Sequence, residues 1–247
     1  MSTLVSAESV YKFYGTGDQE QAILRDVDLT VEEGQFLCVM GPSGSGKSTL
    51  LHMLSGLDEP SAGRIQLGGS DLSQLSHHQR TLQRRKTVGY VFQFFNLLPN
   101  LTVTENVGLP LAIDGSRPGQ RADYVYGLLE RFGIADRASH FPPQLSGGQM
   151  QRTSIARALA GGQPLLLCDE PTGNLSQQAG REVMEALREV CDNDGRSVLL
   201  VTHNPRDACY ADRVHFLVDG AIDPTHTLEG PSLPVERVHE ALAALNI

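Results

Sequence analysis

The sequence contains no tryptophan, and aromatic residues of all kinds make up only 6% of its 247 residues. Cysteine is also scarce, and the four cysteines form no CxxC pair. Cys38 and Cys168 lie in apolar runs, where cysteine behaves as a small hydrophobic residue. This pattern argues against a disulfide-dense scaffold and against a cysteine metal site, and it fits a reducing compartment.

Long hydrophobic runs are missing as well. The longest, such as Leu165–Cys168 and Val198–Val201, are far shorter than the ~20 residues that a membrane-spanning helix needs. Met1–Val10 has no basic region followed by an apolar stretch, so we expect no signal peptide. A role at a membrane would therefore be exerted through a partner.

Positive charge is in deficit, with 20 Lys and Arg against 29 Asp and Glu and a net charge of −9. Binding to nucleic acid backbones favours a basic surface, so we expect no nucleic acid partner and assign the charge to solubility. The 40% of hydrophobic residues is ordinary for a globular protein, and the length is enough to bury a core without disulfides or metals.

Apolar runs alternate with segments of helical periodicity, which predicts an α/β fold with a mostly parallel sheet. Buried strands are expected at Gln35–Met40, Thr87–Phe92, Leu165–Cys168, Ser197–Thr202 and Val214–Val218. Helices are expected at Lys47–Ser55 and Gln177–Val190.

Two other regions have a different pattern. Segments rich in β-forming residues predict an antiparallel β-subdomain beside the core; they are Leu4–Val10, Ile23–Val31 and Ile65–Leu67. The stretch between Gln93 and Ala160 is predicted to be largely helical, with a loop at Asp114–Gln120. We interpret it as an inserted helical subdomain, at about 94–160.

A glycine-rich loop joins the first core strand to the following helix. It fits the GxxxxGK[ST] pattern in the strand–loop–helix context that the motif requires. Its glycines let backbone N–H groups surround phosphate oxygens, and the helix N-terminus adds partial positive charge. We expect Lys47 to reach the β- and γ-phosphates and Ser48 to bind Mg²⁺. The predicted nucleotide-binding residues here are Gly41, Pro42, Ser43, Gly44, Ser45, Gly46, Lys47, Ser48 and Thr49.

The strand Leu165–Cys168 is followed by two acidic residues, Asp169 and Glu170. Asp169, at the strand tip, can hold Mg²⁺ through water. Glu170, one residue further on, can act as a general base on the attacking water. Together with the glycine-rich loop, these residues predict hydrolysis of a nucleotide.

The string Leu-Ser-Gly-Gly-Gln at 145–149 precedes a predicted helix. A serine and two glycines at a helix N-terminus form a second anion-binding surface, yet the chain has only one nucleotide loop. The economical explanation is that Ser146, Gly147, Gly148 and Gln149 face the nucleotide of another subunit. The sequence therefore predicts a homodimer.

At these residues the chain resembles the ATP-binding subunit of ABC transporters, over nearly its whole length. The resemblance implies the ABC ATPase fold, a P-loop NTPase core with an antiparallel β-subdomain and an inserted helical subdomain, and ATP and Mg²⁺ as ligands. Gln93 resembles the Q-loop glutamine that contacts Mg²⁺ and water, and His203 resembles the switch histidine at the γ-phosphate. The implied catalytic residues are Lys47, Gln93, Glu170 and His203, and the implied metal ligands are Ser48, Gln93 and Asp169.

An aromatic residue stacks on adenine in this family, and Tyr14 resembles it, with Tyr11 as the competing assignment. Stacking on a base contributes about 1–3 kcal/mol. The alternative is that Tyr14 simply packs within the β-subdomain. The same resemblance divides the chain into a nucleotide-binding domain, residues 1–228, and a tail, residues 229–247, with a short amphipathic helix that we expect to pack on its own domain.

The segments 91–99, 101–107 and 169–175 resemble the macrolide-export, lipoprotein-release and cell-division (FtsE-type) group. That implies an integral membrane permease of FtsX/MacB type as partner, and a cytoplasmic location, peripheral on the inner face of the cell membrane. The apolar residues Phe94, Phe95, Leu97 and Leu98 either belong to the core of the helical subdomain or form a docking surface for that permease.

One position departs from the family pattern. The family usually has aspartate after Asn-Leu at the dimer seam, and this chain has Ser176. Ser176 can instead cap the helix that follows.

The motifs also allow two other functions: a soluble ABC-type ATPase of repair or translation, and a regulatory module that does not hydrolyse ATP. The acidic charge argues against the first, and Glu170 with His203 argues against the second.

Overall fold

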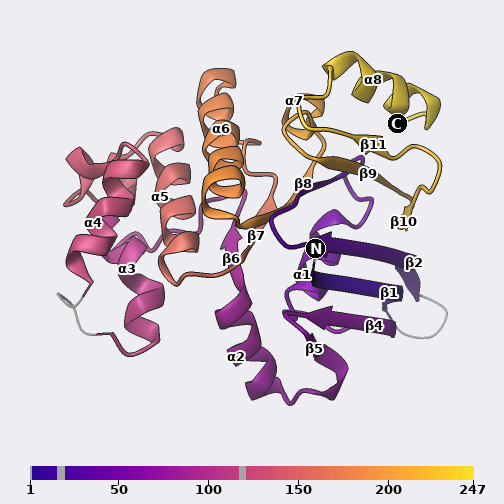
Figure 1. The fold of residues 1–247 in the computed structure, drawn as a ribbon, viewed down its shortest axis with the longest axis horizontal. Helices are drawn as coiled ribbons and strands as arrows, with labels where there is room; N and C mark the ends of the chain where they lie inside the picture. Colours follow the sequence, from indigo (N-terminus) through magenta and orange to yellow (C-terminus); the bar gives the residue numbers. More distant parts are fainter. Residues whose placement is uncertain (1, 16–19, 117–120) are drawn as a thin grey trace.

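The computed structural model describes residues 2–15, 20–116 and 121–247 as two β-sheets with helices around them (Figure 1). The larger sheet contains, in spatial order, β10 (Ala221–Ile222), β9 (Arg213–Val218), β3 (Phe36–Met40), β8 (Ser197–Thr202), β7 (Leu165–Asp169) and β6 (Val88–Val91), and β11 (Leu228–Glu229) also pairs with β9. The five strands from β9 to β6 are parallel, while β10 and β11 run antiparallel to β9. The predicted α/β class with a mostly parallel sheet is confirmed.

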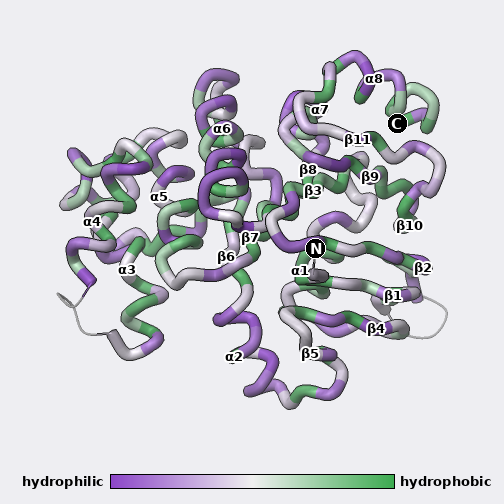
Figure 2. Tube along the Cα trace, viewed as in Figure 1, coloured by the Kyte–Doolittle hydropathy of each residue, from purple (hydrophilic) through white to green (hydrophobic). Residues whose placement is uncertain are grey.

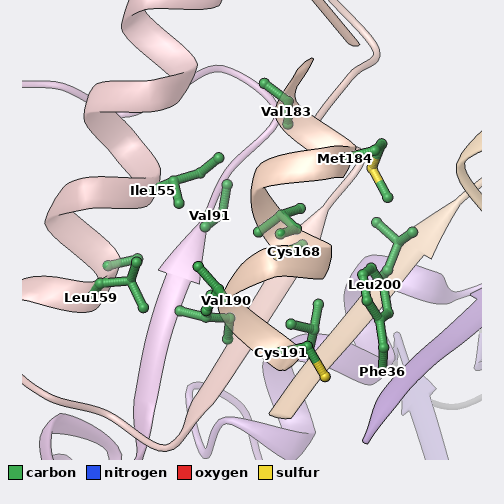
Figure 3. Packing of buried hydrophobic residues seen from close by; sticks show 14 of the residues in the cluster. Phe36, Val91, Ile155, Leu159, Cys168, Val183, Met184, Val190, Cys191 and Leu200 are labelled. Carbon is green, nitrogen blue, oxygen red and sulfur yellow. The ribbon is translucent and has the colours of Figure 1, made fainter. Parts of the chain in front are cut away.

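The parallel strands are buried on both faces, because their alternate side chains enter two different hydrophobic clusters. In β7, Leu166 and Cys168 belong to the cluster under α6 (Gln177–Asp194), while Leu165 and Leu167 belong to the cluster on the opposite face. Figure 3 shows the first cluster, where Cys168 lies close to α6 and Ile155 faces it from a neighbouring helix. The continuous apolar runs of the sequence follow from this double burial.

The second face is covered by α1 (Lys47–Leu54) and by an antiparallel sheet. That sheet contains, in spatial order, β2 (Gln21–Glu32), β1 (Thr3–Tyr14), β4 (Ala62–Leu67) and β5 (Ser70–Asp71). It is the predicted β-subdomain, with longer strands than expected, and it lies beside the parallel sheet in Figure 1. The ends of β1 and β2 next to residues 16–19 extend beyond the apolar segments that predicted them.

The helical subdomain contains α3 (Val103–Ile113), α4 (Ala122–Arg131) and α5 (Gly147–Ala160), with single 3₁₀ turns at Ala135–Arg137 and Pro142–Gln144. Helix α5 packs against α3, α4, α6 and β6, so it links this subdomain to the core. The predicted loop Asp114–Gln120 falls partly on residues 117–120, which lie outside the described residues.

Several short or polar elements were not predicted. Helix α2 (His77–Thr87) is hydrophilic along most of its length, so it has no apolar stripe to reveal it (Figure 2). Its only sequence signal is the capping box of Ser76 and Gln79. Thr87 ends this helix, and the strand that we expected at Thr87–Phe92 is the shorter β6. The four-residue α7 (Pro205–Ala208) and the edge strands β10 and β11 were also missed.

The C-terminal segment forms α8 (Val235–Ala244), which buries Val238 and Ala241 in the cluster under α6 and packs on α7. Among the described residues, no helix has both the length and the apolar character needed to cross a membrane. The division into residues 1–228 and 229–247 stays a prediction.

Candidate ATP-binding and hydrolysis site

The phosphate loop owes its shape to glycines in positions that other residues would strain. Gly44 and Gly46 have positive φ angles of 84° and 103°, and Gly46 is the residue that precedes α1. A Cβ on Gly41 would lie 2.2 Å from the carbonyl oxygen of Leu217. The loop therefore turns tightly between β3 and α1, which leaves the N-terminus of α1 free to meet an anion.

Lys47 is buried and folds back onto this loop. Its Nζ donates to the carbonyl oxygens of Gly41, at 2.8 Å, and of Pro42, at 3.0 Å. The ammonium group is thereby held inside the curve of the loop. Phosphate oxygens can replace the two carbonyl acceptors, and they would provide charge-assisted bonds, which are roughly twice as strong as neutral ones.

Glu170 follows β7 directly and has a left-handed backbone, with φ of 46°. Its backbone N–H donates to Val201 O at 3.0 Å, which ties it to the neighbouring strand. One carboxylate oxygen lies 3.6 Å from Lys47 Nζ, and the other lies 2.8 Å from Nδ1 of His203. A non-glycine residue in this conformation is uncommon, and here it aims the carboxylate between the lysine and the histidine.

Asp169, at the end of β7, accepts a hydrogen bond of 3.0 Å from Oγ of Ser48. Burial raises the pKa of Asp169, an effect that the bond from Ser48 opposes. A half-buried carboxylate beside a hydroxyl suits a hard divalent cation, because Mg²⁺ prefers oxygen ligands and usually shares them with substrate phosphates. The residues present therefore fit a magnesium ion.

Lys47, Ser48, Glu170 and His203 line one cleft of about 420 Å³, and Asp169 lies behind Ser48 without lining it. The cleft is lined by Tyr14, Ile23, Ser43, Gly44, Gly46, Lys47, Ser48, Thr49, Gln93, Glu170 and His203. The structure thus brings together residues from six separate segments of the chain. Of these residues, Ile23 was not predicted: it lies on β2, beside the phosphate loop, and its apolar side chain gives no motif to identify it.

The remaining residues of the predicted loop do not line the cleft but support it. Gly41 and Pro42 supply the carbonyl groups that hold Lys47. Ser45 is buried, and no residue that the structure describes forms a hydrogen bond with its hydroxyl oxygen.

Tyr14 ends β1 at the mouth of this cleft, and its ring is 46% exposed. Its hydroxyl donates to Asp58 at 2.7 Å, and Nζ of Lys12 lies 4.9 Å from the ring centroid. The hydrogen bond to Asp58 is the main reason why the pKa of Tyr14 is raised. Tyr11 instead stacks on Phe13, with centroids 6.3 Å apart, and does not line the cleft. The geometry therefore favours Tyr14 over Tyr11 as the aromatic residue of the site.

The four predicted residues of the LSGGQ string lie outside the cleft, at the N-terminus of α5. Ser146 Oγ accepts from Gln149 N at 3.3 Å, and Gln149 Oε1 accepts from Ser146 N at 2.9 Å, so the two form a capping box. Gly147 is packed closely, since a Cβ there would lie 3.2 Å from Leu175. The string is thus preformed at a helix N-terminus that meets no phosphate loop of its own chain.

A glycine-rich loop between a parallel strand and a helix, with two acidic residues at the tip of another strand, defines a P-loop ATPase. The ABC transporter family matches residues 24–173. The chain belongs to this family, and it is an ATP-hydrolysing, ATP-binding subunit of an ABC transporter.

Two relatives and one solved structure show the extent of the similarity. The lipoprotein-releasing system ATP-binding protein LolD of Shewanella sp. (strain MR-4) is 44% identical over 85% of this chain and 91% of its own length. The macrolide export ATP-binding/permease protein MacB of Rhodopseudomonas palustris (strain BisB18) is 46% identical over 85% of this chain, which spans only 32% of that relative. The dimeric post-hydrolysis structure of the ATP-binding cassette MJ0796 with ADP and Pi superposes with a TM-score of 0.84, at 38% identity, and covers 91% of this chain and 98% of its own.

The similarity to that solved cassette, together with the two sheets described above, confirms the predicted ABC ATPase fold. The comparisons give no support to the alternative of an ATPase that acts in repair or translation.

Proposed function

We propose that two copies of this chain enclose two ATP molecules, and that each site combines the cleft of one copy with the LSGGQ helix of the other. The observation that carries this proposal is the position of Ser146, Gly147 and Gly148 at a helix N-terminus outside their own cleft, with Ser146 exposed. Backbone N–H groups at such an end attract a phosphate. A related cassette has been solved as a dimer bound to ADP and Pi, which supports the dimer.

Within each site, the roles follow from the contacts already described. Lys47 would exchange two carbonyl acceptors for β- and γ-phosphate oxygens. Glu170 would accept the proton of the attacking water, since a general base must lie within hydrogen-bond reach of it. His203, which contacts Glu170, would also contact the γ-phosphate. Ser48, Asp169 and Gln93 would hold Mg²⁺, which supplies charge neutralisation at the phosphates.

A groove of about 320 Å³ between the core and the helical subdomain supports docking of a membrane permease. Its apolar lining includes Leu57, Leu109 and Ile113. Its charged lining consists of three basic residues, Arg84, Arg85 and Arg157, and one acidic residue, Asp114. Burial lowers the pKa of Arg157 only to about 10, so the side chain stays charged at neutral pH. The groove therefore fits an amphipathic segment that carries apolar side chains and a carboxylate.

The segment after Gln93 reaches this groove at Asn96. Phe94 is 72% exposed and Leu98 is 42% exposed, so these two side chains are not part of the core. Phe95 and Asn96 have positive φ angles of 61° and 49°, and their carbonyl oxygens accept from Arg157. Such an arrangement can transmit movement of a docked segment to Gln93, which favours the docking interpretation of the apolar cluster.

The partner that we propose is an integral permease of FtsX/MacB type, which would place the chain on the cytoplasmic face of the membrane. The relatives LolD and MacB support this assignment. The test is recovery of the tagged chain with its membrane fraction. Phe94→Asp should release it, while Tyr126→Asp, at a side chain of 49% exposure on α4, should not. Equal recovery of all three proteins would reject docking through Phe94.

A further inference from the structure

A buried carboxylate that belongs to none of the motifs lies behind the catalytic residues. Asp207, on α7, is 4% exposed. It accepts hydrogen bonds from the hydroxyl groups of Thr172 and Thr202 and, at 3.0 Å, from Nδ2 of Asn204. No lysine or arginine pairs with it within the described part of the chain. Neutral donors alone therefore stabilise its charge. Burial of a charge without an ionic partner costs free energy of folding, and a purely structural position does not require it.

The three donors surround the proposed catalytic residues. Thr202 and Asn204 flank His203 on both sides, and Thr172 lies two residues after Glu170. The fold brings these segments together because β8 and β7 are parallel neighbours, and α7 packs across the end of β8 and β3. Asp207 thus joins the loop that carries the histidine to the loop that carries the base.

The hydroxyl group of Thr202 also connects Asp207 with Glu170. Its oxygen lies 3.3 Å from Oε2 of Glu170 and 3.4 Å from Oδ2 of Asp207. A hydroxyl group has one proton and can donate to only one of these acceptors at a time. When the Thr202 hydroxyl group donates its hydrogen bond to Asp207, Oε2 of Glu170 loses one donor. It keeps its contacts with His203.

We propose that Asp207 is a positioning residue for ATP hydrolysis, which orients Glu170 and His203 through Thr172 and Thr202. The carboxylate holds both threonine hydroxyls and thereby fixes the backbone on each side of the cleft. It also draws the Thr202 proton away from Glu170, which leaves that carboxylate freer to accept a proton from water. This inference rests on the proposed roles of Glu170 and His203.

The informative substitution is Asp207→Asn, because the amide keeps the shape but has only one acceptor oxygen. If its NH₂ group faces the threonines, the Thr202 proton turns to Glu170. If the NH₂ group faces Asn204, two donors oppose each other. In both orientations we expect kcat to fall by about tenfold or more, as misplacement of reacting groups does. KM for ATP should change less than about twofold, because Tyr14 and the phosphate loop are untouched.

The experiment measures steady-state ATPase kinetics of the full chain with three further variants. Asp212→Asn is the matched control, because Asp212 is a partly buried carboxylate that binds Phe36 N at 2.8 Å and Arg188, away from the cleft. It should keep kcat even if stability falls. Thr202→Val should lower kcat, and its combination with Asp207→Asn should be no worse than the more harmful single change.

Glu170→Gln separates the two levels of the argument. If Glu170→Gln retains full turnover, the proposed function of Glu170 fails. If Glu170→Gln is inactive while Asp207→Asn retains wild-type kcat, or loses kcat and ATP affinity together with the Asp212→Asn control, the positioning role is overturned.

Discussion

Nδ1 of His203 lies 2.8 Å from Oε2 of Glu170, so the proposed γ-phosphate contact and the proposed base are in direct contact with each other. Glu170→Gln should leave ATP binding unchanged, since the amide has the same shape, but should lower turnover by about 10²–10⁴-fold through loss of the base. Nucleotide binding and ATPase assays check this. Sizing chromatography with Mg²⁺ and ATP should show the variant as a stable dimer. An active monomer would contradict the role of Glu170.

The shared site is tested by mixing two inactive chains. Lys47→Ala removes the buried ammonium from the cleft, and Ser146→Arg blocks the LSGGQ helix and its capping box. A mixed dimer contains one site damaged on both sides and one site that is intact. Mixing should therefore restore part of the ATPase activity, in proportion to the fraction of mixed dimers. A specific activity that is independent of concentration, with no recovery on mixing, would reject a composite site.

The parallel core could be predicted because its strands are buried on both faces, which leaves apolar runs such as Leu165–Cys168 that end at chemical signals. Motifs identified most of the cleft, because a phosphate loop needs glycine where φ is positive, as at Gly44 and Gly46. Helix α2 was missed because its side chains are polar on every face, so its formation depends on its cap and on tertiary contacts.

Asp207 shows what a motif search cannot find. Its neighbours Thr172 and Thr202 come from strands and loops that are 35 and 5 residues distant along the chain. The cluster exists only once β7, β8 and α7 have packed, and the sequence Pro-Arg-Asp-Ala by itself indicates no more than a short turn after a strand. The same holds for Ile23, which reaches the cleft only because the β-subdomain packs against the core.

The buried position of Asp207 predicts an unusual dependence of stability on pH. Burial raises the pKa of Asp207 from its ordinary 3.8 to about 6, so the folded protein holds this proton more tightly than the unfolded chain. Between these two pH values, Asp207 is deprotonated in the unfolded chain but still protonated in the folded protein. The free energy of unfolding therefore falls as pH rises from about 4 to 6. At about 1.4 kcal/mol per pKa unit, the loss is about 3 kcal/mol.

Denaturant unfolding of the wild type and of Asp207→Asn between pH 4 and 7 measures this effect. The variant lacks the titrating group, so it should gain stability relative to the wild type as pH rises and keep that advantage above pH 6. The neighbouring groups Glu170, Cys38, Cys209 and Tyr210 interact with Asp207, and they are present in both proteins. A difference that is constant with pH would show that Asp207 titrates normally.

The last prediction concerns Ser176, which replaces the aspartate usual for the family. In the structure it caps α6, because its Oγ accepts from Ala179 N at 3.3 Å. By resemblance it also lies at the dimer seam, where a carboxylate could accept bonds of about 1.5–3 kcal/mol against about 0.5–1.5 kcal/mol for a hydroxyl. A difference near 1.4 kcal/mol changes the population of closed dimer about tenfold. We therefore expect Ser176→Asp to raise turnover without a permease, at unchanged ATP affinity.

The matched control is Ser176→Asn, since asparagine caps a helix as well as aspartate does but carries no charge. Both variants should unfold within about 0.5 kcal/mol of the wild type, and only the aspartate should accelerate hydrolysis. If repulsion between the new carboxylate and the ATP phosphates prevails, Ser176→Asp will be slower than Ser176→Asn, with a higher KM. If all three proteins hydrolyse ATP at the same rate, Ser176 is a helix cap only.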